Sequence, residues 1–211
     1  MLCSAWAPAL KKTRVAGERD EAARQAFGAA VQQVPLDKLV FFDECGFALN
    51  LHRLYGWLLG GGRLEEQVPF QKGHNRSVVG AFSLPDAAHP TGVRALWQKK
   101  GAWNAHTFTL FVQEAVLPDL PQGSVLVLDN ASIHKSSALK VAVEEAGCSL
   151  LFLPTYSPDL NPIELFWSWL KQIVRLAAPR DDQHRRELLY QIALSLSPQH
   201  AQAWFHHCGL G

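Results

Sequence analysis

Three short runs of β-forming apolar residues constrain the fold of this chain more than any other feature. The runs are Leu39–Phe42, Val125–Leu128 and Leu150–Leu153. Short continuous apolar runs are typical of strands that are buried on both faces of a central sheet. Two further strands are predicted at 77–84 and 93–98, between turns rich in Pro and Gly. Together with a strand predicted at 49–57, they predict an antiparallel meander.

Helical patterns alternate with the later strands. Apolar spacing predicts helices over 17–34, 107–117 and 136–146. A helix over 162–176 is predicted because Asn161 is a good N-cap and Pro162 suits the first helical position. Near the C-terminal end, a last helix is expected to run through Leu194.

The order of elements predicts an α/β fold, with a mixed sheet flanked by helices. With 211 residues, the chain is long enough for one domain with a short appendage. We place a helical appendage at 1–36 and the main domain at 37–211. Trp167 and Trp169, within one predicted helix, are expected to lie in the core or at an interface rather than to stack on bases.

Composition excludes several classes of protein. The formal net charge of +1 gives no overall electrostatic signature for nucleic acid, so any such function must depend on local sites. The four cysteines are scattered without a Cys-x-x-Cys pair, which indicates neither a zinc finger nor a disulfide framework. No apolar run is long enough to span a bilayer, and no signal peptide is recognisable. A soluble intracellular protein is expected.

Three carboxylates occupy positions that suit a metal site. Asp43 and Asp129 follow two of the apolar runs, and Glu164 lies in the first turn of a predicted helix. Neighbouring strands could bring the two Asp side chains together, and a crossing helix could add Glu164. Clustered carboxylates repel one another unless a cation neutralises them. Two simpler roles stay open, because each Asp could form a turn and Glu164 could complete a capping box with Asn161.

Residues near the three acids also have two interpretations. Glu44 points to the opposite side of the strand from Asp43, which favours a structural or outer contact. Asn130 and His134 follow the second acid, where they either form a turn and a cap or contact the site from behind. Basic side chains that either form a solvated face or contact phosphate are Lys135, Lys171 and Arg175, with Arg76, Lys99 and Lys100 as weaker candidates.

Three segments resemble a known family. They are Asp43-Glu44-Cys45-Gly46-Phe47, the stretch Leu128-Asp129-Asn130-Ala131-Ser132-Ile133-His134-Lys135, and the stretch from Leu153-Pro154 through Ser157-Pro158-Asp159-Leu160-Asn161-Pro162-Ile163-Glu164. They are similar to the DDE transposases of the mariner-type superfamily, in the bacterial insertion-sequence 630 branch. The 34 residues between Asp129 and Glu164 match the spacing of that branch. The resemblance runs from about Lys11 to the terminal segment from Trp204 to Gly209.

The resemblance implies a ribonuclease-H-like catalytic domain, with Asp43, Asp129 and Glu164 as the catalytic triad. It implies two Mg²⁺ or Mn²⁺ ions, DNA cleavage and strand transfer at transposon ends, and a double-stranded target with a TA dinucleotide. The working species would be a homodimer or larger, in the bacterial cytoplasm on chromosomal or plasmid DNA. Thr155 departs from the family, which usually has a second proline there, and Cys45 stands where a small polar residue is frequent.

The resemblance leaves one part of the family unmatched. Full-length members carry an N-terminal helix-turn-helix region, whereas about 40 residues precede Asp43 here. We therefore expect the catalytic part alone, which a separately encoded helix-turn-helix subunit would complete. Two alternatives stay open: a truncated or inactive DNA-binding remnant of a transposase, and a ribonuclease-H-like nuclease that performs no strand transfer.

Overall fold

The computed structural model describes residues 16–48, 51, 60, 63, 65, 75–179 and 181–211. Its strands form one sheet in the order β3-β2-β1-β4-β5. Their bounds are β1 Leu39–Phe47, β2 Arg76–Ser83, β3 Val93–Lys100, β4 Val125–Leu128 and β5 Ser149–Phe152. Strands β1, β2 and β3 pair antiparallel, which confirms the strands predicted at 77–84 and 93–98, and β4 and β5 continue the sheet in parallel with β1. The strand considered at 49–57 lies outside the described residues, apart from Leu51.

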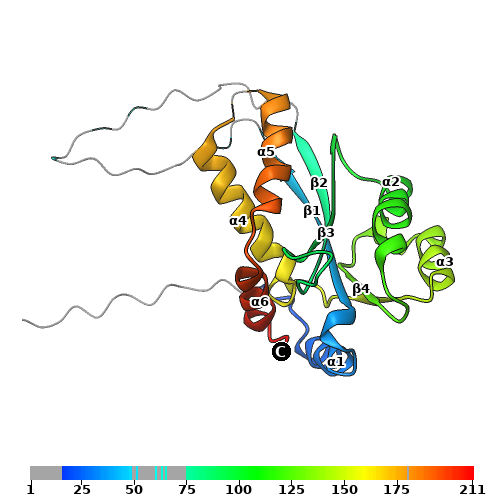
Figure 1. Cartoon of the computed structure of the whole chain (residues 1–211). Helices are drawn as coiled ribbons and strands as arrows, with labels where there is room; N and C mark the ends of the chain where they lie inside the picture. Colours follow the sequence, from blue (N-terminus) through cyan, green and yellow to red (C-terminus); the bar gives the residue numbers. More distant parts are fainter. Residues whose placement is uncertain are drawn as a thin grey trace, which may run out of the picture.

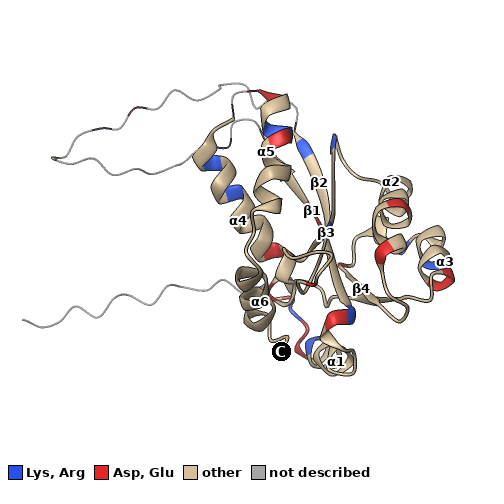
Figure 2. Cartoon of the chain, in the orientation of Figure 1, with Lys and Arg blue, Asp and Glu red and all other residues tan. Residues whose placement is uncertain are grey.

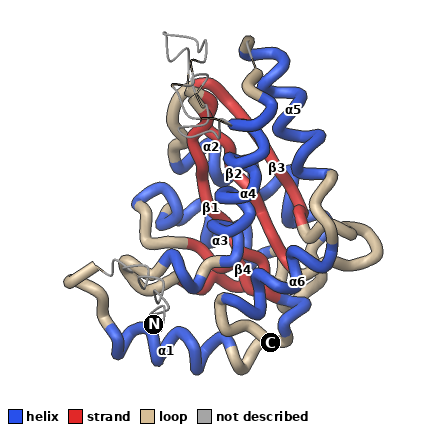
Figure 3. Tube along the Cα trace, turned by 90° about the vertical axis from the view of Figure 1, so that its left-hand side faces the viewer, coloured by secondary structure: helices blue, strands red, loops and turns tan. Residues whose placement is uncertain are grey.

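Helices cover both faces of the sheet. Their bounds are α1 Glu21–Val31, α2 Ala105–Phe111, α3 Ser137–Glu145, α4 Pro162–Ala177, α5 Asp182–Leu194 and α6 Pro198–His207. Figure 1 shows α4, α5 and α6 on one face and α2 and α3 on the other, and Figure 3 shows α4 running in front of the strands. The helix predicted over 107–117 is regular only as far as Phe111, because a wider turn over Val112–Val116 follows. Within the described part of the chain, no helix combines the length and the apolar character needed to cross a membrane.

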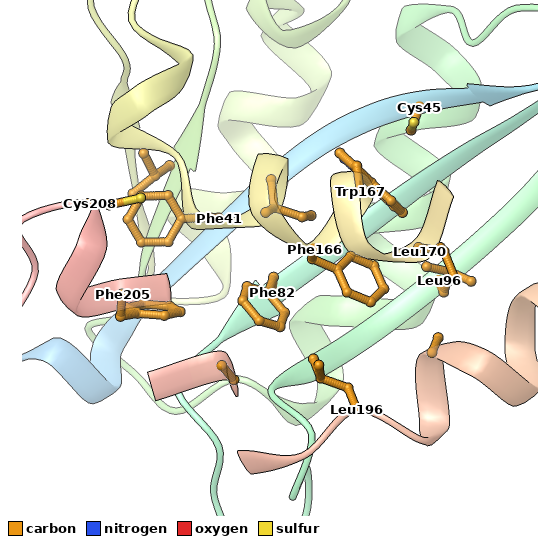
Figure 4. Packing of buried hydrophobic residues seen from close by; sticks show 14 of the residues in the cluster. Phe41, Cys45, Phe82, Leu96, Phe166, Trp167, Leu170, Leu196, Phe205 and Cys208 are labelled. Carbon is orange, nitrogen blue, oxygen red and sulfur yellow. The ribbon is translucent and has the colours of Figure 1, made fainter. Parts of the chain in front are cut away.

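The sheet separates two apolar cores. Successive side chains of a strand point to opposite faces, so Phe41, Cys45 and Phe47 pack under α4, whereas Val40 and Phe42 pack under α2. Figure 4 shows the first of these cores, with aromatic side chains of α4 and α6 over those of the strands. Burial on both faces explains the continuous apolar run before Asp43 and confirms its interpretation as a central strand.

Helix α4 packs closely on the sheet because the facing strand residue is a glycine. A Cβ atom at Gly80 of β2 would lie 2.9 Å from the ring of Trp167 and 3.3 Å from Ile163. Trp167 is 2% exposed and packs edge-on against Phe47, with ring centroids 6.4 Å apart. The prediction that Trp167 belongs to the core is therefore confirmed. Asn161 caps the helix by accepting a hydrogen bond from the backbone N–H of Ile163.

A charged cluster fixes α5 to the sheet. Arg76 of β2 donates two hydrogen bonds to Asp182, and the fully buried Arg185 donates to the carbonyl oxygen of Phe47 at 2.9 Å and to Asp182. Arg76 is itself buried. The idea that Arg76 contacts phosphate is thus wrong, because its guanidinium is engaged inside the fold.

Replacing Asp182 by Asn lowers the free energy of unfolding at pH 7 by about 1–2 kcal/mol, a modest value because Asp182 is partly exposed. The hydrogen bond from Arg76 holds the pKa of Asp182 well below its usual range. Its stabilising effect is therefore complete above the unfolded pKa of about 4 and is lost as pH falls through the folded pKa. Urea unfolding at pH 7 and pH 3.5 should show the difference from wild type shrinking on acidification. A comparable loss in the exposed control Asp119→Asn would contradict this assignment.

Candidate active site

The register of the sheet brings Asp43 and Asp129 side by side. The pairing between β1 and β4 ends at Phe41 and Val127. Asp43 and Asp129 each lie two residues beyond this last pair. Because side chains alternate, both acids return to the face covered by α4. The apolar run had suggested a strand that ends at Asp43. The strand instead continues to Phe47, because its antiparallel pairing with β2 persists.

Glu164 approaches the same place from the covering helix. It lies in the first turn of α4, which crosses the sheet at Gly80, the pairing partner of Asp43. Asp43, Asp129 and Glu164 line one cavity of about 290 Å³, whose other walls come mainly from the loop over 153–158. Tyr156 on this wall is 61% exposed and has a backbone φ of 53°, which is rare for a bulky side chain. The structure thus brings together the three acids that the sequence singled out.

The three acids differ in their electrostatic surroundings. Burial, together with the negative charges of Glu164, Glu44 and Asp129, raises the pKa of Asp43 to about 8. Partial burial also raises the pKa of Glu164, against the opposing effect of the nearby Lys171 ammonium. The folded protein therefore carries an electrostatic cost at this cavity that a bound cation would relieve.

Asp129 has the opposite environment because a buried histidine contacts it. Its Oδ1 lies 2.7 Å from Nδ1 of His134 and also accepts the backbone N–H of Ala131 at 2.9 Å. The other ring nitrogen of His134 lies 2.9 Å from Oε1 of Glu44. The hydrogen bond from His134 lowers the pKa of Asp129. Burial alone would lower the pKa of His134, but its bonds to the two carboxylates raise it to about 9.

The chemistry of the donor set fits a hard divalent cation. Three carboxylates on one cavity supply the oxygen ligands that Mg²⁺ and Mn²⁺ prefer. Within the described residues, however, no three His, Cys, Asp or Glu side chains are placed closely enough to hold an ion as they stand. Rotation of the acidic side chains would have to accompany binding.

The remaining predicted residues fall into three groups. Asn130 lines the cavity and donates a hydrogen bond to the carbonyl oxygen of Leu153 at 2.6 Å. Lys171 lies beside both Cys45 and Glu164. Lys135 is exposed near Asp129, with its ammonium 6.0 Å from the Phe152 ring, and Arg175 is exposed on α4.

The alternative role of Glu164 as a capping-box residue finds no support. A capping box requires the Glu164 carboxylate to accept a hydrogen bond from the backbone N–H of Asn161. That N–H instead bonds the carbonyl oxygen of Pro158, and the Asn161 side chain caps the helix without help. Within the described part of the chain, the helix cap does not use the Glu164 carboxylate, which can therefore serve the cavity.

Sequence reasoning missed a contact that holds the loop before α4. Asp159 in this loop receives two hydrogen bonds from Arg24 of α1, at 2.7 and 3.1 Å, and one from Arg19 at 3.2 Å. Asp159 lies 140 and 135 positions after Arg19 and Arg24 in sequence, so no local pattern could pair them. Helix α1 thereby braces the segment that leads into Glu164.

Comparisons with known proteins agree with this geometry. Residues 38–185 match the family model described as DDE superfamily endonuclease. A Mos1 transposase paired-end complex with left transposon end gives a TM-score of 0.70 at 16% identity, over 93% of this chain and 62% of that chain. The Mos1 transposase catalytic domain with Raltegravir and Mn gives a TM-score of 0.63 at 16% identity, over 92% and 91% of the two chains. The predicted ribonuclease-H-like fold is thereby confirmed.

The match to a curated relative covers a shorter segment of the chain. The uncharacterized protein y4pE/y4sA of Sinorhizobium fredii (strain NBRC 101917 / NGR234) is 42% identical over 48 residues, which are 23% of this chain and 33% of that protein. The chain thus spans about a third of this relative and about three fifths of the Mos1 chain in the paired-end complex.

Proposed function

Because the chain belongs to the family described as DDE superfamily endonuclease, we propose that it is the catalytic domain of a transposase of the mariner-type superfamily, insertion-sequence 630 branch. In this proposal it is a metal-dependent DNA endonuclease and strand transferase that acts on transposon ends. The observation that carries the proposal is the convergence of Asp43, Asp129 and Glu164 on one cavity from β1, β4 and α4.

In the proposed mechanism the three carboxylates hold two Mg²⁺ or Mn²⁺ ions. When bound, such ions lower the pKa of an attacking water or 3′-hydroxyl and stabilise the oxygens of an in-line displacement at phosphorus. Asp43, from the rigid centre of the sheet, and Asp129, fixed by His134, would orient the ligand oxygens. Glu164 would close the site from the helix. Asn130, tied to the loop at Leu153, would keep the cavity open beside Asp129.

Local positive charge supports DNA as the substrate. Figure 2 shows the basic residues of α4, which are Lys171 and Arg175, on the helix whose first turn carries Glu164. Lys135 adds an exposed ammonium on the Asp129 side, and exposed Tyr156 offers a ring on which a base could stack. We propose that these four side chains guide double-stranded transposon ends, and a target with a TA dinucleotide, to the acids.

The proposed partners follow the same reasoning. Joining two transposon ends requires two active sites, so we propose a homodimer or larger as the working species. We also propose that recognition of the ends depends on a helix-turn-helix region, in the same polypeptide or in a separate subunit.

The test is cleavage of supercoiled plasmid DNA in the presence of excess Mg²⁺ or Mn²⁺. We expect nicked and linear products from the wild type, none in EDTA and none from Glu164→Ala. Glu114→Ala, exposed on the far side of the sheet, is the matched control and should cut like the wild type. A labelled strand with a free 3′-hydroxyl added to the reaction should appear in joined products.

Each result decides between the candidates. Cleavage without joined products would favour a nuclease that lacks strand transfer. Complete inactivity in both metals would favour an inactive remnant. Equal activity of Glu164→Ala and wild type would refute the proposed site.

A further inference from the structure

The strands that carry Asp43 and Asp129 separate where the two acids begin. The backbone pairing of β1 with β4 ends at Phe41 and Val127, and β4 itself ends at Leu128. Beyond these residues, backbone hydrogen bonds no longer fix the distance between the two strands. Something else must hold Asp129 in place relative to Asp43.

One buried side chain bridges this gap. His134 is 0% exposed, and its ring packs 4.4 Å from the ring of Phe108, centroid to centroid. Its Nδ1 lies 2.7 Å from Asp129 on one side and its Nε2 lies 2.9 Å from Glu44 on the other. Each ring nitrogen thus lies within hydrogen-bond distance of one carboxylate oxygen, and an imidazole side chain can contact two such groups at once. Glu44 follows Asp43 directly, so the bridge connects the two strands next to both acids.

The bridge uses only one oxygen of Asp129. Oδ1 accepts hydrogen bonds from His134 and from the backbone N–H of Ala131. Oδ2 accepts no hydrogen bond from any described residue, and Asp129 lines the cavity. An aspartate held in this way has one oxygen fixed by the protein and one available to a ligand. Side chains that fix a metal-binding group by such bonds govern both its orientation and its affinity.

We propose that Glu44 and His134 form a positioning bridge that fixes Asp129 with its Oδ2 available to a divalent cation. Neither residue touches the cation, and both act through Asp129. The inference rests on the proposed function, since it assumes that Asp129 is a ligand. It assigns a role to Glu44, which the motif alone left as a structural or outer contact.

The test measures Mn²⁺ affinity by titration calorimetry and by the electron paramagnetic resonance of free Mn²⁺, with thermal unfolding in EDTA as a separate readout. The bridge predicts a 10- to 100-fold weaker affinity, roughly, for His134→Ala and for Glu44→Ala. Glu44→Gln keeps an oxygen that accepts the Nε2 hydrogen bond, so its affinity should stay within about fivefold of the wild type. Glu144→Gln, on the exposed face of α3, is the matched control and should bind like the wild type.

Several outcomes would overturn the bridge. Wild-type affinity in folded His134→Ala and Glu44→Ala would do so, and so would equal losses in Glu44→Gln and Glu44→Ala. If His134→Ala does not fold, the two Glu44 variants still decide, because Glu44 is on the periphery of the bridge at 18% exposure. Asp129→Ala is the reference for the proposed function. If wild type and Asp129→Ala bind Mn²⁺ equally, the metal site itself fails, whereas loss in Asp129→Ala alone refutes only the bridge.

Discussion

We expect Asp43→Asn to lower the rate of the proposed DNA cleavage by about a thousandfold or more and at the same time to stabilise the metal-free fold. Loss of one charged ligand removes several kcal/mol of transition-state stabilisation, and about 4 kcal/mol corresponds to a thousandfold in rate. The stability gain has a different cause. Burial and neighbouring acids raise the pKa of Asp43 to about 8, so ionising this carboxyl opposes folding.

The pH dependence of this gain has a definite sign. An acid whose folded pKa lies above its unfolded value of about 4 destabilises the fold increasingly as pH rises between the two values. Asn has no such dependence. In EDTA, urea unfolding should therefore give Asp43→Asn a free energy of unfolding at least about 1 kcal/mol above that of the wild type at pH 8. The difference should be smaller at pH 5.

Asp129→Asn is the matched control for this prediction. It should lose cleavage to a similar extent, but it should also lose stability, because the hydrogen bond from His134 lowers the pKa of Asp129. The two variants would thus share one defect in catalysis and differ in the sign of their stability change. A gain of stability in both variants, or in neither, would contradict the electrostatic assignment of the two acids.

Trp167→Ala lowers the free energy of unfolding by about 3–5 kcal/mol, the usual cost of removing a large buried ring. Trp167 is 2% exposed, and it fills the space that the missing side chain of Gly80 leaves between α4 and β2. Backbone around a glycine in the centre of a sheet has little freedom to collapse into the resulting cavity. The measurement is the midpoint of urea unfolding, with the m-value checked for a change in cooperativity.

Trp169→Ala provides the comparison on the same helix. Trp169 is only partly buried, next to Trp204 of α6 at 6.2 Å between ring centroids. Its loss should cost about half as much or less, because part of the ring already contacts water. Equal losses from the two substitutions would show that the contact with Gly80 does not dominate the seating of α4.

The sequence predicted the frame of the molecule better than its cross-connections. Apolar runs and caps located β1, β4, β5 and α4 because each signal is local. The ribonuclease-H-like class followed from the resemblance rather than from periodicity, and the order of the strands in the sheet was not predicted. Helix α6 was missed, although Ser197 at its N-cap and Pro198 in its first turn are local signals that were available.

Side-chain partnerships were beyond reach for a physical reason. Alternation along β1 correctly separated Glu44 from Asp43, but the partner of Glu44 lies 90 residues away at His134. Arg76 was considered for phosphate because an isolated arginine in a sequence does not reveal Asp182, which lies 106 residues later. Such pairs form only when the fold brings distant segments together. The boundary between residues 36 and 37, and the catalytic roles of the three acids, stay predictions.

The contact between α1 and Asp159 bears on how this molecule can be divided. A deletion that begins the polypeptide at β1 removes Arg19 and Arg24 and so releases the acidic loop five residues before Glu164. Such a deletion would retain every acid of the site and still loosen one of them. Helix α1 therefore belongs with the proposed site when the N-terminal region is shortened or exchanged. A fragment that keeps the contacts of Asp159 has to begin before Arg19.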